Sequence, residues 1–204
     1  MASFVLSLVL CVAGITVVVR IVAGMRKPPS RADRYLTDTI LTLLLAVALQ
    51  VRTVRADFDA WAGWNVTWPT QHALVMLSAW WALNYLVHAT STDSSRLRGF
   101  IRRHALVSGL TIVATIAAFA AEPTAPDFWY GPAGRIEGGG EVNAAGVVAF
   151  MVYGLYMTGS MALQAVHTVR WVRRAHVRWL GIGLGVIACG LVCGFAFGVD
   201  TAGF

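Results

Sequence analysis

Five side chains that can form hydrogen bonds recur at helical spacing in the segment 153–167. They are Tyr153, Tyr156, Ser160, Gln164 and His167. Steps of three or four residues place them along one face of a helix. A face of this kind can bind a small molecule, an ion or a proton, or it can join neighbouring helices through polar packing. We therefore take it as the first candidate for a functional site.

A second polar face lies within the segment 71–89, where Asn84 and His88 are one helical turn apart. We predict that these two residues meet Gln164 and His167 in one cluster near one end of the bundle. The cluster either binds a ligand or only packs helices together. Two imidazoles at one depth can also ligate b-type haem. That alternative rests on His88 and His167 alone, and we expect no cofactor.

The motifs of common active sites and metal centres are missing from the sequence. It contains no HExxH helix, no GxSxG turn and no CxxC pair. The cysteines Cys11, Cys189 and Cys193 lie within apolar runs and are interpreted as small buried side chains. We expect no metal site, name no catalytic residue, and do not expect the protein to be an enzyme.

The elements that carry these residues are apolar helices. The 204 residues are 57% hydrophobic and 13% charged, whereas a soluble domain is about half apolar and about a quarter charged. Six apolar runs are long enough to cross a bilayer as helices, roughly 3–24, 35–51, 71–89, 104–121, 143–166 and 179–199. We predict an all-α, polytopic transmembrane bundle of six spans, forming one domain over residues 1–204.

The basic residues are unevenly divided between the connectors. Of 16 lysines and arginines, all but Arg52, Arg55 and Arg135 fall in or beside the first, third and fifth connectors. The positive-inside rule makes these connectors cytoplasmic and puts both termini outside. The scarcity of lysine, with Lys27 alone, indicates a bacterial, actinobacterial source. We expect a multi-pass protein of the plasma membrane, with anionic inner-leaflet lipid rather than nucleic acid as its partner.

Charges and aromatic residues near the predicted boundaries give further expectations. Arg20 and Asp38 either form an ion pair or Arg20 extends alone to the interface. On the outer side, Phe58 and three tryptophans are spaced to share one face of a helix, or to form an ordinary aromatic belt. These tryptophans and the one in the outer loop 122–141 are the outer-face candidates: Trp61, Trp64, Trp68 and Trp129.

Small residues recur every four positions in the sixth run. Glycine rows let helix backbones approach closely. We therefore predict that a partner helix or a second copy of the chain packs against this helix through Gly181, Gly185, Gly190 and Gly194.

The order of these features resembles an uncharacterised actinobacterial family of integral membrane proteins, often labelled transporters. The resemblance rests on the Arg/Pro connector near 26–34, the Arg-rich connector near 96–103, Asp127-Phe128 in the outer loop, and the segment 153–184. It implies a bundle with one helix more than predicted here, followed by a cytoplasmic region. This chain departs from the pattern by having six runs, as a shortened chain or a short relative would.

Two functions are compatible with these features. The first is a membrane regulatory, sensory or partner-binding module with an unknown ligand. The alternative is a small-molecule or ion transporter whose path is the polar face of 153–167.

Overall fold

The computed structural model describes residues 2–26, 28–49, 51–63, 66–90, 94–120 and 144–172. Within these residues the chain forms six α-helices and no strand, so the predicted all-α class is confirmed. The helices are α1 Ala2–Arg26, α2 Arg31–Ala48, α3 Arg52–Ala62, α4 Thr67–Thr90, α5 Ser94–Ala120 and α6 Ala144–Val172.

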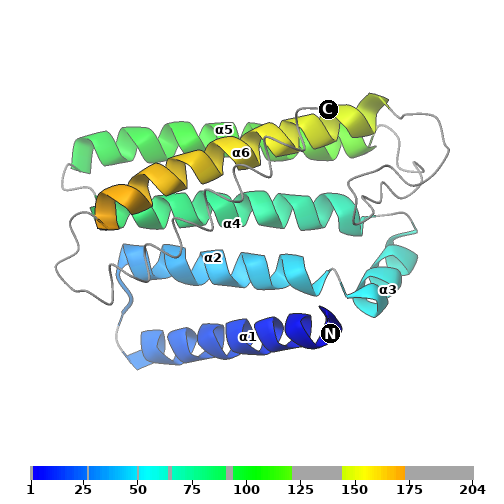
Figure 1. The fold of residues 1–204 in the computed structure, drawn as a ribbon, viewed down its shortest axis with the longest axis horizontal. Coiled ribbons are helices and arrows are strands. Elements are labelled where there is room, and N and C mark those ends of the chain that lie inside the picture. The colour runs from blue at the N-terminus through cyan, green and yellow to red at the C-terminus, as the bar shows by residue number, and fades with distance from the viewer. Residues whose placement is uncertain are drawn as a thin grey trace.

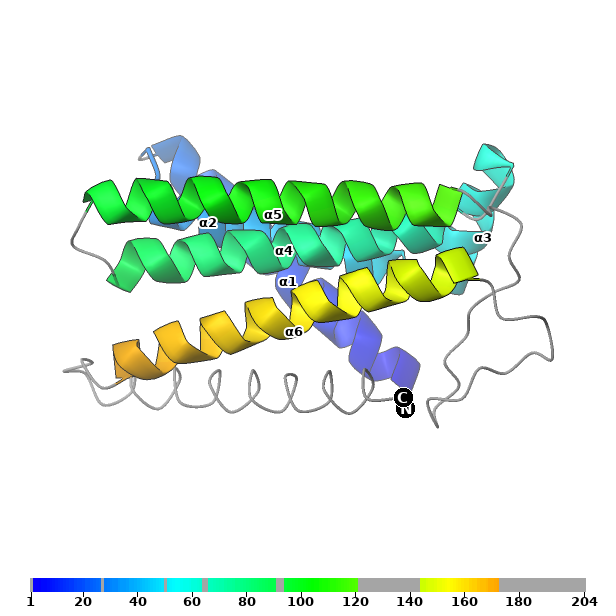
Figure 2. The same ribbon diagram turned by 90° about the horizontal axis from the view of Figure 1, so that it is seen from above.

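The five long helices lie side by side with alternating direction, and the short α3 lies at one end (Figure 1). Helix α4 is central because it packs against α2 on one side and against α5 and α6 on the other. Helices α5 and α6 also contact each other, while α1 packs against α2. Figure 2 shows that α6 lies beside α4 and is inclined to both α4 and α5. This arrangement brings the polar faces of α4 and α6 into the same interior.

Five of the six predicted apolar runs correspond to the long helices, and the run 179–199 lies outside the described residues. By length and hydropathy, Leu97–Ala118 of α5 is the one straight segment of the described chain that could cross a membrane. Helices α2 and α3 pass the same test only as a pair bent by 85°, and the apolar segment Gly14–Met25 of α1 is shorter. The six-span bundle is therefore not established by these helices.

The connection from α3 to α4 corrects one prediction. One of the two alternatives for Phe58 and the three tryptophans was a shared face of a single helix, but α3 ends at Ala62 and α4 begins at Thr67. Gly63 stops α3 by adopting the left-handed conformation, with φ of 73°, which glycine enters without steric cost. The Asp59 carboxylate then accepts the backbone N–H of Thr67 at 2.8 Å, satisfying a free donor at the start of α4.

The best packed part of the bundle lies where α4, α5 and α6 meet. Met76, Ala79 and Tyr156 form a buried apolar cluster. Ile112, Tyr153 and Met157 pack around it. This cluster is small, and the side chains that continue the interior above and below it are mostly polar.

Candidate functional site

Ten described side chains of α4, α5 and α6 that carry polar atoms are each at most 9% exposed, and seven of them form the set considered next. We call this set the polar interior: Asn84, His104, Ser108, Tyr156, Ser160, Gln164 and Thr168. The predicted polar face of α6 contributes its three central members, and these turn toward α4 and α5. Neutral hydrogen-bonding groups are tolerated in such a place only where they find partners.

Tyr156 and Gln164 join the helices directly. The Tyr156 hydroxyl lies 3.0 Å from Ser108 Oγ on α5 and 3.4 Å from the carbonyl oxygen of Met76 on α4. About two turns further along α6, Gln164 Nε2 donates to the carbonyl oxygen of Ala79 at 3.2 Å. These contacts hold α6 at a defined rotation against α4.

Several other groups of the polar interior have no hydrogen-bond partner in the described chain. They include both side-chain atoms of Asn84, Nδ1 of His104, and the hydroxyls of Ser160 and Thr168. Asn84 and Thr168 are completely buried. A buried donor or acceptor without a partner costs about 1–3 kcal/mol. These groups are therefore the ones best placed to bind a polar molecule.

The ends of the predicted face on α6 contact aromatic rings instead. At one end, the ring of Tyr153 meets His72 edge-on, with centroids 4.5 Å apart, and His72 stacks on Trp68 at 3.9 Å. At the other end, His167 meets Phe100 of α5 at 6.2 Å. Tyr153 and His167 are half-buried, so the fully buried part of this face of α6 lies between them.

Of the predicted four-residue cluster, the two histidines pack against different rings. His88 packs on Tyr35 of α2 with ring centroids 5.0 Å apart, whereas His167 contacts α5. Asn84, His88 and Gln164 make no hydrogen bond to one another. Two imidazoles directed at different neighbours do not match the facing pair that bis-histidine haem needs. Within the described residues, no group of three or more His, Cys, Asp or Glu is placed to hold a metal ion.

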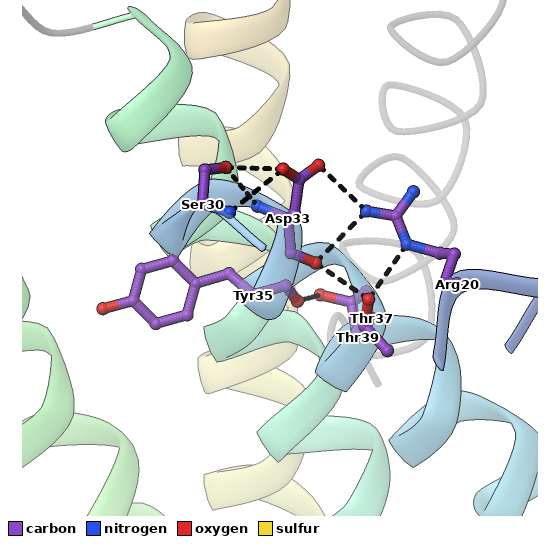
Figure 3. A network of polar contacts seen from close by, with 6 residues as sticks. All are labelled: Arg20, Ser30, Asp33, Tyr35, Thr37 and Thr39. Atoms are coloured by element: carbon purple, nitrogen blue, oxygen red, sulfur yellow. Dashed lines mark hydrogen bonds and ion pairs between the residues drawn. The ribbon is translucent and has the colours of Figure 1, made fainter. Parts of the chain in front are cut away.

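A second polar network joins α1 to the start of α2 and corrects the predicted partner of Arg20 (Figure 3). Arg20 forms its ion pair with Asp33 at 3.2 Å, and the ion pairs of the described residues do not include Asp38. Arg20 Nε also donates to Thr37 Oγ1 at 2.9 Å. The sequence pattern missed this because Asp33 lies in the first turn of α2, outside the apolar run.

Asp33 is also held by the cap of its own helix. Ser30 Oγ donates to the Asp33 carboxylate at 2.6 Å, while Asp33 N–H donates back to Ser30 Oγ at 3.1 Å. This is a capping box, which satisfies free donors at the helix start. The hydrogen bond from Ser30, helped by the charge of Arg20, lowers the pKa of the Asp33 carboxyl below its ordinary value.

The outer aromatic candidates are divided between two helices. Trp61 on α3 is 82% exposed and stacks on Phe58 at 5.9 Å. Trp68 on α4 is half-buried against His72. Trp64 and Trp129 lie outside the described residues, as do the glycines at 181, 185, 190 and 194.

Sequence reasoning missed three residues that the fold makes important. Thr168 continues the four-residue spacing from Ser160 and Gln164, so the same periodicity would have found it. Ser108 and Tyr35 gave no such indication, because each becomes significant only through a neighbouring helix.

Comparison of the chain with known protein families, characterised proteins and solved structures found no match. The candidate site is therefore described by its own geometry.

Proposed function

We propose that the protein is an integral membrane protein of the bacterial plasma membrane, with the apolar parts of α1, α2, α4, α5 and α6 crossing the bilayer. One observation carries this proposal: the usual burial pattern is inverted. Large apolar side chains such as Ile15, Leu110 and Leu155 are more than 60% exposed. Asn84, Thr115 and Thr168 are completely buried. Lipid hydrocarbon around the bundle would accept the exposed apolar side chains and would exclude the polar side chains, which are buried.

Helix length and charge placement support the same proposal. Helices α1, α4, α5 and α6 have 25, 24, 27 and 29 residues. At about 1.5 Å per residue each exceeds the hydrocarbon thickness of about 30 Å. Apart from Arg52 and Arg55 on α3, the arginines of the described chain gather where α1 and α6 end and α2 and α5 begin, which we assign to the cytoplasmic side. Anionic lipids would contact this end.

Within the membrane, the protein acts as a regulatory or sensory module that binds a small polar molecule at the polar interior. The unpartnered atoms of Asn84, His104, Ser160 and Thr168 are its proposed ligand-binding groups. The neutral character of all four side chains suits a neutral or zwitterionic ligand, because a charged one would need a buried counter-ion.

A transporter is the second candidate, and a separate observation favours it. Buried polar atoms without a hydrogen-bond partner also occur beyond the polar interior. They belong to Thr115 in the second half of α5 and to Thr67, the first residue of α4, at the other end of that helix from Asn84. They thus extend along the bundle from one end toward the other. A row of polar groups across the membrane is what a transported molecule needs.

Reporter fusions test the membrane proposal. Alkaline phosphatase fused after Gly63 should be active outside the cell, whereas a fusion after Thr90 should be inactive and the corresponding green fluorescent protein fusion fluorescent. The opposite pattern would contradict the orientation. Inactivity of the phosphatase at both positions would contradict the crossing of α4.

Ligand binding and transport are separated by a second experiment. The purified protein in detergent is screened for thermal stabilisation by a panel of small polar metabolites, together with the variant Asn84→Leu. The matched control is Thr111→Val, since the Thr111 hydroxyl bonds only to the carbonyl of Val107 in its own helix. We expect a stabilising compound whose effect is lost in Asn84→Leu and kept in the control. Uptake of that compound into proteoliposomes would support the transporter, and binding without uptake the sensory module. A panel without any stabilising compound would contradict both.

A further inference from the structure

A cavity of about 400 Å³ lies at the basic end of the bundle, between α2, α4 and α5. Its wall includes three arginines, Arg31 at the first residue of α2 and Arg98 and Arg102 near the start of α5. Tyr35 and His88, whose rings contact each other at a tilt, form another part of the wall. Residues far apart in the sequence thus place cationic and donor groups around one space.

The three arginines have no acidic partner in the part of the chain that the structure describes. The ion pairs found there join Arg20 to Asp33 and Arg55 to Asp59. Like charges around one cavity repel each other. A wall of a single sign also concentrates ions of the opposite sign. The charge of the cavity wall therefore favours the binding of an anion.

The position of Arg31 is unfavourable for its own helix. The first turn of a helix carries partial positive charge and is stabilised by acidic side chains, not by cations. The first turn of α2 does hold Asp33, but its carboxylate is already bonded to Ser30 and Arg20, and the first turn of α5 contains no acidic residue. The helix ends that disfavour arginine favour a bound anion. An anion in the cavity would offset both the repulsion and the unfavourable dipole.

We propose that this cavity binds a phosphate group, with Arg31, Arg98 and Arg102 as its ligands and His88 as a further donor. A guanidinium group can donate two parallel hydrogen bonds to the oxygens of a phosphate. Three positive charges also suit the charge of a phosphate group better than the single negative charge of a carboxylate. Leu97 and Ile101 add apolar wall beside the arginines. The phosphate belongs either to an anionic lipid or to a soluble compound, and both present the same group to the arginines.

The test compares two variants of the full chain that lose the same charge at the same end. One carries Arg98→Gln and Arg102→Gln. The control carries Arg103→Gln and Arg170→Gln, which are exposed and do not belong to the wall of this cavity. Binding of dioctanoyl phosphatidylglycerol is measured by native mass spectrometry in detergent, and binding of inorganic phosphate by calorimetry. Circular dichroism checks that each variant keeps its helices.

We expect the cavity variant to bind at least one probe about tenfold more weakly than the wild type, while the control stays within about twofold. Lipid binding that inorganic phosphate does not displace would identify a lipid phosphate, and displacement would identify a soluble one. Equal loss in both variants would overturn the proposal, because diffuse charge would then explain the binding. Equal retention in both variants, or a wild type that binds neither probe, would overturn it as well.

Discussion

The polar interior and the Arg20–Asp33 network both join helices by hydrogen bonds, but they use different groups. In the interior, the bonds of Tyr156 and Gln164 are made by neutral side chains that are less than a tenth exposed. In the network, both partners are charged, and their side chains are 26% and 56% exposed. Burying a charge costs several kcal/mol, whereas a neutral pair costs far less. The molecule therefore keeps its ion pair where water can reach it.

This difference predicts which contacts control stability. A buried contact loses packing and hydrogen bonding together when it is removed, whereas water replaces most of an exposed one. Variants in the two regions should consequently differ in the size of their effects and in their response to salt and pH.

Tyr156→Ala should have the largest effect. It removes a buried ring from the apolar cluster and the hydrogen bond to Ser108, at a cost of about 3–5 kcal/mol in the free energy of unfolding. Tyr156→Phe keeps the ring and should cost only about 1 kcal/mol. Chemical unfolding in detergent micelles measures both. Equal losses would mean that the hydroxyl, and not the ring, stabilises this region.

Gln164→Ala should cost about 1–2 kcal/mol, since it removes the bond to the Ala79 carbonyl and a buried side chain. Gln164→Leu keeps most of the volume and serves as the control. We expect leucine to lose less stability than alanine. Leucine keeps most of the packing, and the Ala79 carbonyl, which loses the bond from Gln164, remains part of the backbone hydrogen bonding of α4. If leucine and alanine destabilise equally, the hydrogen bond rather than packing carries the contribution.

Ser30→Ala should cost about 1 kcal/mol, because it removes the cap of α2 and the hydrogen bond to Asp33. Ser30→Thr retains a capping hydroxyl and should restore most of the stability. Thermal unfolding followed by circular dichroism detects the change. A threonine variant as unstable as the alanine variant would argue against capping as the cause.

Arg20→Met should cost less than about 1 kcal/mol at ordinary ionic strength, since water reaches both partners and the Asp33 side chain is more than half exposed. High salt should shrink the difference from the wild type further, because ions screen exposed pairs. The same salt series on Gln164→Ala should leave its effect unchanged. If the loss of unfolding free energy in Arg20→Met does not change with salt, the Arg20–Asp33 pair behaves like a buried contact and this prediction is wrong.

The smallest effect should come from the titration of Asp33. Its pKa is lowered in the folded chain, mainly by the hydrogen bond from Ser30, so the unfolded chain binds the proton more readily. This contribution to stability is present above the ordinary pKa of an aspartate and is lost as the pH falls through the lowered value. Asp33→Asn should remove this part of the acid dependence. An unchanged pH profile in that variant would assign it to other carboxyls.

Local pattern predicted the helices well, and the exceptions have physical causes. Apolar runs located five long helices, although α5 begins ten residues before its predicted run and α6 ends six residues after its own. The helix ends were less predictable, because caps such as the Ser30–Asp33 box and the turn at Gly63 depend on a few local hydrogen bonds rather than on hydropathy.

The sequence by itself determined that the chain is rich in helix, that most of its arginines fall in or beside alternate connectors, and that α6 has a polar face. These properties follow from residue spacing and composition, which act along one helix. Only the tertiary structure decided that Tyr156 meets Ser108, that Arg20 pairs with Asp33, and that His88 and His167 turn to different neighbours. The rotation of each helix against its neighbours is set by the packing of many side chains at once, and no single segment contains that information.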